Sequence, residues 1–400
     1  MVTQFYPPVV GGQEQHVRNL AHALVQRGHR VEVVTIAIDG PQGTTRDGAV
    51  PVHRIRTTAQ HLPRLYGDPM RPHAMPIVDP GFRSAIGRLL AVDHFDILHA
   101  HDWSISSAIG PARHSRVPVV LTQHDYSHVC ATKRLMRGDE VCPGPSPIAC
   151  VRCASSWHGP VVGPAVALAN ALGRRTRTRH ADAFLPVSSV VAVSTGLPGR
   201  SPYTVIPNFI PDDLLVGEAV PRPDGPIVFV GDLSRDKGIE VLIEAHRVLR
   251  ALPHLMLAGR AFEETPRDLP DRVELCGLLD HASVINLMQT ACLVVVPSIV
   301  PDCCPTVVLE AMAVGRPVVA AASGGIVDLV DDGVTGLLVA PGNPIALSTA
   351  LSAVLNDRDG AAAMGRRALD RARSFTASAV VGRIEELYES LVSRTGRRDE

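Results

Sequence analysis

The sequence predicts an α/β protein built from two doubly wound parallel-sheet domains in tandem. Strand-like apolar runs alternate with helical stretches along nearly the whole chain. A polar, proline-rich stretch at residues 207–226 interrupts this alternation and marks a linker. With 400 residues, the chain has room for about two or three domains with large cores.

The first half starts with a helix followed by a strand. Apolar residues within 17–25 recur at the spacing of one helical face, and Gly28 then occupies a position typical of a helix C-terminus. Residues 31–36 follow as a strand. Further strands of this half are expected at residues 97–100, 117–122, 183–187 and 204–206.

The second half repeats the pattern and completes the domain prediction. Its strands are expected at residues 227–230, 255–258, 273–276, 293–296, 318–321 and 336–339. We expect an N-terminal domain at 1–210 with a cysteine-containing insertion at about 127–160, a C-terminal domain at 211–375, and a last helix at 376–400. Doubly wound sheets bind ligands at the carboxyl ends of their strands, here in the cleft between the domains.

Composition excludes several classes of protein. Hydrophobic residues make up 46% and charged residues 20%, and the mean hydropathy is +0.13, which excludes a disordered chain. No apolar run reaches about 18 residues, and residues 1–8 have neither a basic region nor an apolar signal core. The sequence therefore predicts a cytoplasmic protein.

Charge is divided unevenly along the chain. Residues 1–213 carry 21 Arg and Lys against 15 Asp and Glu, and the remainder carries 18 against 25. This division argues against a nucleic-acid binder and leaves an anionic partner, such as a membrane surface, open for the first half. Only Lys133 and Lys237 are lysines, so each is a candidate functional residue, with chance as the alternative.

Two glycine-containing turns could hold an anion. Gly11 and Gly12 lie between the first strand and the first helix. Glycines there let the backbone approach a ligand closely, and the amides at the helix start favour an anion. A purely structural turn is the alternative. In the second half, Arg235 and Lys237 stand just before a helix that begins near Ile239. Two cations there could clamp a diphosphate, and an ordinary charged loop is the alternative.

The segment from Val296 to Val319 is the most specific. A strand ends, a proline-rich loop follows, and a helix carries Glu310 eight residues after Asp302. The amides of Thr306 and Val307 at the helix start suit phosphate. A carboxylate can accept hydrogen bonds from two ribose hydroxyls, so this segment predicts a nucleotide site.

Taken in order, these segments resemble the retaining glycosyltransferases of family 4, which have the two-domain GT-B fold with two Rossmann-like domains facing across a cleft. The resemblance covers essentially the whole chain, and each motif alone is weak. The matching segments are Pro-Pro-x-x-Gly-Gly at 7–12, His99-Ala-His-Asp102, Leu121–Tyr126, Val205–Asn208, the Lys237–Gly238 turn, Asp302-x7-Glu310-Ala-Met and Gly324–Gly325.

The resemblance implies transfer of a sugar from a nucleoside diphosphate sugar, expected to be a UDP- or GDP-sugar. Lys237 and a nearby arginine, for which Arg235 is the candidate, would hold the diphosphate; Glu310 would hold the ribose, and Asp302 would lie by the donor sugar. The Gly11–Gly12 loop would approach the diphosphate from the acceptor domain. The resemblance also implies that the last helix, 376–400, crosses back to the N-terminal domain. No metal is required for catalysis, because basic side chains and amides neutralise the departing diphosphate.

On the acceptor side, the resemblance places His124 by the reacting centre and His99, His101 and Asp102 near a glycan, lipid-linked or small-molecule acceptor. A structural histidine is an equal alternative for His99 and His101. If the acceptor is lipid-linked, the arginine-rich residues 172–180 could dock on anionic headgroups and make the protein peripheral at the inner face of the membrane; a solvated helix face is the alternative.

The chain departs from the family pattern in three places. Gly231-Asp232 replaces the usual Gly-Arg, so Arg235 would have to substitute. Asp302 replaces Glu and is shorter by one methylene. The first strand begins almost at Met1, so we expect either a shortened central strand or an assigned start that lies too late. A catalytically impaired sugar-nucleotide-binding protein, or another GT-B enzyme such as a sugar-nucleotide epimerase, is therefore an alternative.

A cysteine cluster lies outside these motifs. Four cysteines fall within 24 residues and end in Cys-x2-Cys. In a reducing compartment, this pattern is compatible with a structural zinc site, with free thiols or with a disulfide pair. The cysteines are Cys130, Cys142, Cys150 and Cys153.

Overall fold

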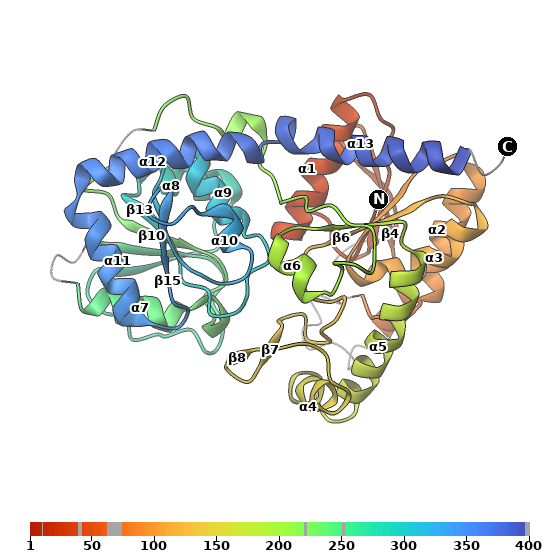
Figure 1. The fold of residues 1–400 in the computed structure, drawn as a ribbon, viewed down its shortest axis with the longest axis horizontal. Coiled ribbons are helices and arrows are strands. Elements are labelled where there is room, and N and C mark those ends of the chain that lie inside the picture. Colours follow the sequence, from red (N-terminus) through yellow and green to blue (C-terminus); the bar gives the residue numbers. More distant parts are fainter. Residues whose placement is uncertain (10, 39–41, 62–73, 220–221, 250–252, 397–400) are drawn as a thin grey trace. The chain divides into compact units, whose positions relative to one another are not determined.

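The protein folds into two units (Figure 1). The structure is a computed structural model that describes residues 1–9, 11–38, 42–61, 74–219, 222–249 and 253–396. The N-terminal unit comprises Met1–Pro207 and Val380–Glu400, and the C-terminal unit comprises Asn208–Ala379. The expected boundary at 210/211 thus lies slightly after the division found in the structure.

A seven-stranded sheet forms the centre of the N-terminal unit, in the order β3-β4-β2-β1-β5-β6-β9. Neighbouring strands are parallel except for β3, which runs antiparallel to β4 at one edge. The five strands β2, β1, β5, β6 and β9 are buried throughout, as expected for strands covered by helices, whereas β3 at the edge is polar and largely exposed. The strands are β1 (Val2–Thr3), β2 (Val33–Ile36), β3 (Gly43–Asp47), β4 (Val50–Ile55), β5 (Leu98–His101), β6 (Val119–Gln123) and β9 (Ala183–Pro186).

Helices connect the strands of this unit. The predicted helix over 17–25 is the C-terminal part of α1, whose residues Val17, Leu20 and Leu24 are buried. An insertion between β6 and β9 carries a two-stranded hairpin, β7 (Met136–Arg137) and β8 (Glu140–Val141), followed by two helices. The helices are α1 (Gly12–Gln26), α2 (Pro80–Val92), α3 (Ile105–His114), α4 (Pro147–His158), α5 (Val162–His180) and α6 (Ser189–Ser194).

The C-terminal unit has a six-stranded, wholly parallel sheet in the order β12-β11-β10-β13-β14-β15. Its buried aliphatic core lies between this sheet and helices α7 and α11. The elements are β10 (Ile227–Val230), α7 (Ile239–Arg247), β11 (Leu255–Ala258), β12 (Val273–Gly277), α8 (His281–Thr290), β13 (Leu293–Val296), α9 (Thr306–Ala313), β14 (Val318–Ala321), α10 (Ile326–Leu329), β15 (Gly336–Val339), α11 (Pro344–Asn356) and α12 (Arg358–Ala372).

The last helix, α13 (Ala377–Gly396), belongs from Val380 onward to the N-terminal unit. Glu385 on this helix pairs with Arg27 at 2.6 Å and with His29 at 2.8 Å, just after α1. Tyr388 donates to or accepts from His99 on β5 at 2.6 Å. These contacts fasten the end of the chain to the first half of the sequence.

Three details differ from the sequence prediction. The strand expected at 204–206 is absent, and only Tyr203 forms a bridge, to Phe184. The hairpin of β3 and β4 was not predicted. Residues 208–219, within the predicted linker, pack in the C-terminal unit, where Asn208 Nδ2 donates to the Cys304 carbonyl at 2.7 Å.

Candidate functional site

Adjacent strands β10 and β13 mark the centre of the C-terminal sheet. From β10 the chain continues to β11 and β12 on one side, and from β13 it continues to β14 and β15 on the other. Such a reversal is a topological switch point, where doubly wound sheets bind ligands at the carboxyl ends of the strands. Lys237 follows β10 and Asp302 follows β13. The structure therefore brings two of the predicted donor residues to this point.

Lys237 and Asp302 form an ion pair. Lys237 Nζ donates to Asp302 Oδ2 at 2.7 Å, and Ser298 Oγ donates to the same oxygen at 2.7 Å. Burial alone would lower the pKa of Lys237, but the Asp302 carboxylate outweighs burial and raises it. The lysine side chain is still 32% exposed. Lys237 is thus a held positive charge that an anionic ligand can reach.

Two glycines fix the loops around this ion pair. Gly324 has φ +58°, and a Cβ there would overlap the carbonyl oxygen of Asp302. Gly238 has φ +74°, and its Cβ would overlap the carbonyl oxygen of Pro297. Only glycine combines the left-handed conformation with so close a backbone approach. The Gly325 N–H also donates to the Asp302 carbonyl at 2.6 Å, which ties the two loops together.

Glu310 belongs to a second group of contacts on α9. The N–H groups of Thr306 and Val307 lie in the first turn of this helix, where a helix offers no acceptors of its own. Glu310 lies one turn further and is largely buried. Its Oε1 is 3.1 Å from His281 Nε2, and this contact raises the pKa of His281. A carboxylate with one oxygen held in this way keeps acceptor capacity for hydroxyl groups.

Asp232, which departs from the family pattern, forms an ion pair in the structure. Arg260, after β11, places Nη2 3.2 Å from Asp232 Oδ2, and its guanidinium lies 4.5 Å from the centre of the Phe262 ring. An arginine from the loop after β11 thus pairs with the acidic residue at this position. Arg235 lies in a short 3-10 turn, Arg235–Lys237, directly before α7. Both arginines follow strands that meet at the carboxyl edge of the sheet.

The N-terminal sheet has its own switch point, between β1 and β5. Asp102 follows β5 with φ +79°, an unusual conformation for a residue with a side chain. Its carboxylate accepts from the Gln4 N–H at 2.9 Å, from Gln13 Nε2 at 2.7 Å and from the Ser104 N–H at 2.7 Å. Burial raises the pKa of Asp102 to about 6 despite these donors. Asp102 thereby joins β1, α1 and β5.

The predicted Gly11–Gly12 turn lies at the same edge. Gly11 precedes α1, and its φ of 172° is extended backbone that any residue adopts. A Cβ on Gly11 would, however, overlap the Glu14 carboxylate. That carboxylate is the far end of a flexible side chain and can move, so neither space nor backbone conformation requires glycine at this position.

Two buried histidines and the half-buried His124 gather around the buried His101, the residue before Asp102. His101 Nδ1 and His124 Nε2 are 3.0 Å apart, and their rings stack with centroids 5.2 Å apart. His16 on α1 contacts the His124 ring edge-on at 4.8 Å. His99 stacks on His101 at 4.2 Å. The structure therefore brings His124 together with His101 and, through stacking, with His99.

The environments of these histidines differ in one respect. His99 is 2% exposed, and both of its ring nitrogens have partners, Tyr388 Oη at 2.6 Å and Thr122 Oγ1 at 2.6 Å. This arrangement favours the structural alternative for His99. Burial holds the pKa of His16, His99 and His101 well below the usual range, so these imidazoles are neutral. A neutral His101 can accept or donate one hydrogen bond to His124 and so orient its ring.

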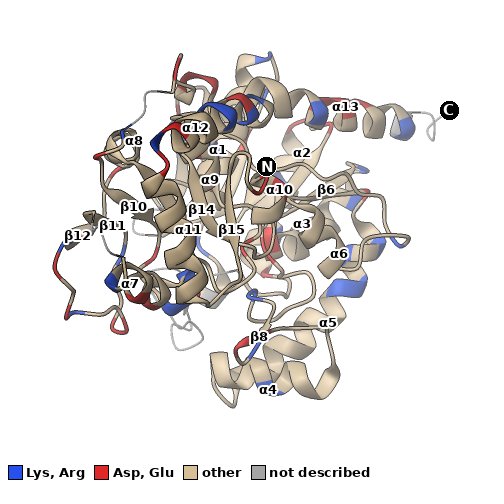
Figure 2. Ribbon diagram, turned by 60° about the vertical axis from the view of Figure 1, so that its left-hand side comes forward, with Lys and Arg blue, Asp and Glu red and all other residues tan. Residues whose placement is uncertain are grey.

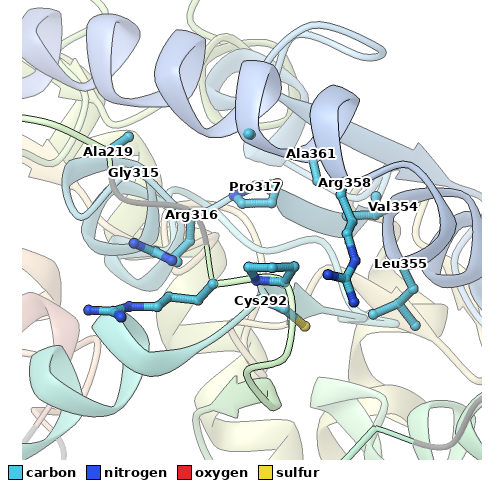
Figure 3. A pocket seen from close by; sticks show the side chains of 12 residues that line it. Ala219, Cys292, Gly315, Arg316, Pro317, Val354, Leu355, Arg358 and Ala361 are labelled. Atoms are coloured by element: carbon cyan, nitrogen blue, oxygen red, sulfur yellow. The ribbon is translucent and has the colours of Figure 1, made fainter.

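Two other features lie away from these residues. A surface hollow of about 460 Å³ at the opposite, amino edge of the C-terminal sheet is lined by Arg222, Arg316 and Arg358 (Figure 3). Basic residues also lie in the C-terminal half of α5, within the predicted membrane-docking stretch 172–180 (Figure 2). Arg177 in this stretch, however, is 1% exposed and donates to Asn170 Oδ1 at 2.7 Å. It cannot contact headgroups. No helix within the described ranges is long and apolar enough to span a bilayer.

Comparisons with known proteins agree with the arrangement of motifs. The family model described as Glycosyltransferase Family 4 matches residues 10–214, and the one described as Glycosyl transferases group 1 matches residues 225–357. The chain belongs to glycosyltransferase family 4. Among curated relatives, the glycogen synthase of Mycobacterium tuberculosis is 30% identical over 434 aligned residues, covering 100% of this chain and 95% of the relative.

Solved structures show that this glycosyltransferase has the GT-B fold. Sucrose-phosphate synthase from Thermosynechococcus elongatus superposes with a TM-score of 0.75 at 22% identity, covering 98% of this chain and 99% of that one. Anabaena Alr3699/HepE in complex with UDP-glucose superposes with a TM-score of 0.70 at 19% identity, covering 97% and 99%. The predicted fold class is thereby confirmed.

Four residues of this glycosyltransferase's candidate site were missed by sequence reasoning. They are neighbours of predicted residues from segments distant in sequence: His16, Arg260, His281 and Tyr388. His16 lies on the buried face of α1 beside Val17, where a single histidine reads as part of the core. Arg260 follows Gly259 after a strand, a sequence signal that could have identified it.

Proposed function

We propose that this glycosyltransferase moves a sugar from a nucleoside diphosphate sugar, a UDP- or GDP-sugar, to a glycan, lipid-linked or small-molecule acceptor with retention of anomeric configuration. The Lys237–Asp302 pair at the switch point of the C-terminal sheet carries this proposal. In this pair, the lysine supplies a positive charge for the diphosphate, and the aspartate supplies a carboxylate that can accept hydrogen bonds from the sugar. The superposition on a UDP-glucose complex adds support for a nucleotide-sugar partner.

In this proposal, the C-terminal unit holds the donor. Lys237 has three N–H donors, so it can contact a diphosphate while keeping its bond to Asp302. Arg260 or Arg235 adds a second cation, and the first-turn amides of α9 bind phosphate oxygens. Glu310 accepts from the ribose hydroxyls. Asp302 and Ser298 lie at the end of β13, where Asp302 accepts from hydroxyls of the donor sugar.

The N-terminal unit supplies the acceptor side. In a front-face displacement, the acceptor oxygen bonds to the anomeric carbon from the side on which the bond to the diphosphate oxygen breaks. The acceptor proton passes to that diphosphate oxygen, and the electron pair of the broken bond stays with the diphosphate. His124, oriented by His101, polarises groups at the reacting centre and is not a nucleophile. Charge on the leaving group is stabilised by the basic side chains.

A sugar-nucleotide-binding protein without turnover is the second candidate. Asp232 favours it, because a carboxylate stands where the family has an arginine and occupies Arg260 at 3.2 Å. Turnover of any nucleotide sugar would eliminate this candidate.

The chemical class of the acceptor determines whether the enzyme acts at a membrane surface. A lipid-linked acceptor would bring the exposed residues Arg175 and Arg179 of α5 to the cytoplasmic membrane surface, whereas a soluble acceptor would not require them.

His124→Ala tests the assignment of the two units. We expect calorimetry to show unchanged nucleotide affinity, and we expect turnover of the bound nucleotide sugar, including slow transfer to water, to fall by about 100-fold or more. His114→Ala, on the exposed end of α3, is the matched control and should leave both unchanged. Unchanged turnover by His124→Ala would contradict the proposal for His124.

A further inference from the structure

We propose that the insertion between β6 and β9 contains a structural zinc site. Its ligands are the thiolates of Cys130, Cys142, Cys150 and Cys153. The site lies within the N-terminal unit and does not depend on the proposed function, since it concerns how the insertion is held.

All four cysteines line a single pocket. They reach it from three different elements. Cys130 comes from the turn after β6, Cys142 follows β8, and Cys150 and Cys153 lie three residues apart on one face of α4. None of the four forms a disulfide. Four thiols from separated segments in one pocket match the ligand set of a closed tetrahedral zinc site.

The present contacts of the sulfurs are weak and can be exchanged for a metal. Cys142 Sγ donates to the Gly144 carbonyl at 3.4 Å, and Cys153 Sγ donates to the Met136 carbonyl at 3.5 Å. The Ser146 N–H donates to Cys150 Sγ at 3.3 Å. A backbone N–H directed at sulfur is the contact that stabilises a thiolate ligand, so Cys150 already has one such donor.

Zinc is held by thiolates, so each thiol that binds gives up its proton to solvent as the ion enters.

Helix α4 packs on α5 but buries little apolar surface of its own. Of the twelve residues of α4, all of which the structure describes, Ala154 alone is buried. Ile148 is 70% exposed and Trp157 is 54% exposed. A short helix with so little apolar burial gains most from a cross-link to neighbouring segments, and zinc would join α4 to the β6 turn and to the hairpin.

Closing the site requires side-chain movement. Across the part of the chain that the structure describes, no three Cys, His, Asp or Glu side chains already form a group that could hold a metal ion. Zinc–sulfur bonds are about 2.3 Å long, so the thiols must turn into the pocket as the ion binds.

Metal content of the untagged full chain, expressed with added zinc and purified without chelator, tests this proposal. We expect about one zinc per chain in the wild type and less than about a tenth of that in Cys150→Ser and Cys153→Ser. Cys276→Ser, on edge strand β12 of the other unit, is the matched control and should keep its zinc. A wild type with well under one zinc per chain would overturn the proposal.

A second measurement remains decisive if the serine variants fail to fold. The wild-type chain, stripped by a chelator, is titrated with Co²⁺ and its visible spectrum is recorded. Strong d–d bands with thiolate charge-transfer bands indicate tetrahedral thiolate coordination and support the site. Weak bands typical of octahedral oxygen coordination, or a disulfide between any two of the four cysteines in peptide mapping, would overturn it.

Discussion

Replacing Lys237 with methionine removes the charge at the centre of the proposed donor site. The variant keeps most of the aliphatic side chain but loses the 2.7 Å bond to Asp302 and the cation for the diphosphate. Ser298 still donates to Asp302, and the lysine side chain is about one third exposed, so the free energy of unfolding should fall by only about 1 kcal/mol. Stability is therefore largely preserved.

Nucleotide binding should be affected far more. A charge-assisted hydrogen bond to a diphosphate contributes about 2–3 kcal/mol, which corresponds to a Kd about 30- to 150-fold higher in the variant. Isothermal titration with UDP, GDP and ADP measures this ratio. We expect the wild type to bind one of these nucleotides clearly better than the others, and the variant to lose that binding.

Lys133→Met is the matched control, because it removes the only other lysine of the chain and lies in the N-terminal unit. It should leave the nucleotide Kd unchanged. A Kd for Lys237→Met within about threefold of the wild type would refute the assignment of Lys237 to the diphosphate.

Three further predictions follow from packing and burial. Gly324→Ala should weaken nucleotide binding and stability together, whereas Gly342→Ala, at φ +70° in open space, should cost about 1 kcal/mol of stability alone; equal nucleotide affinity of the two variants by calorimetry would contradict the role of Gly324. Tyr388→Phe removes the bond to His99 and should lower the free energy of urea unfolding by about 1–2 kcal/mol, and an unchanged unfolding midpoint would count against this anchor. Acid should destabilise the N-terminal unit, because four buried imidazoles have pKa values below 6.5 and the unfolded chain binds protons that the folded chain excludes. Their contribution is present above about pH 6.5 and is progressively lost between pH 6.5 and about pH 5.5, and Asp102, whose pKa burial raises to about 6, opposes this loss only in part. Urea unfolding between these pH values checks this, and a flat profile would contradict it. The four are His16, His99, His101 and His128.

Local patterns were sufficient to predict the two parallel sheets. Apolar runs such as Ile227–Val230 and Leu293–Val296 are strands because they are buried on both faces, and that burial is visible as uninterrupted apolar sequence. The hairpin of β3 and β4 was not predicted, because its first strand lacks such an apolar run. Residues Gly43–Asp47 are polar and largely exposed at the sheet edge, so they carry no apolar signal.

Site residues followed a similar rule. Lys237 and Asp302 lie in loops directly after strands, and chain topology alone places such loops together. Tyr388 could not be assigned in this way, because its contact with His99 spans 289 residues and depends on where α13 packs. Pairings of this kind are fixed by tertiary packing, which a single sequence does not encode in any local pattern.

The anomeric configuration of the released sugar tests the central claim most directly. Proton NMR can follow the enzyme with its preferred nucleotide sugar as the donor is slowly transferred to water, before the product equilibrates in solution. The account predicts that the first sugar released has the same anomeric configuration as the donor, and that His124→Ala slows its appearance. Release of the opposite anomer, or no turnover of any UDP-, GDP- or ADP-sugar, would contradict the account.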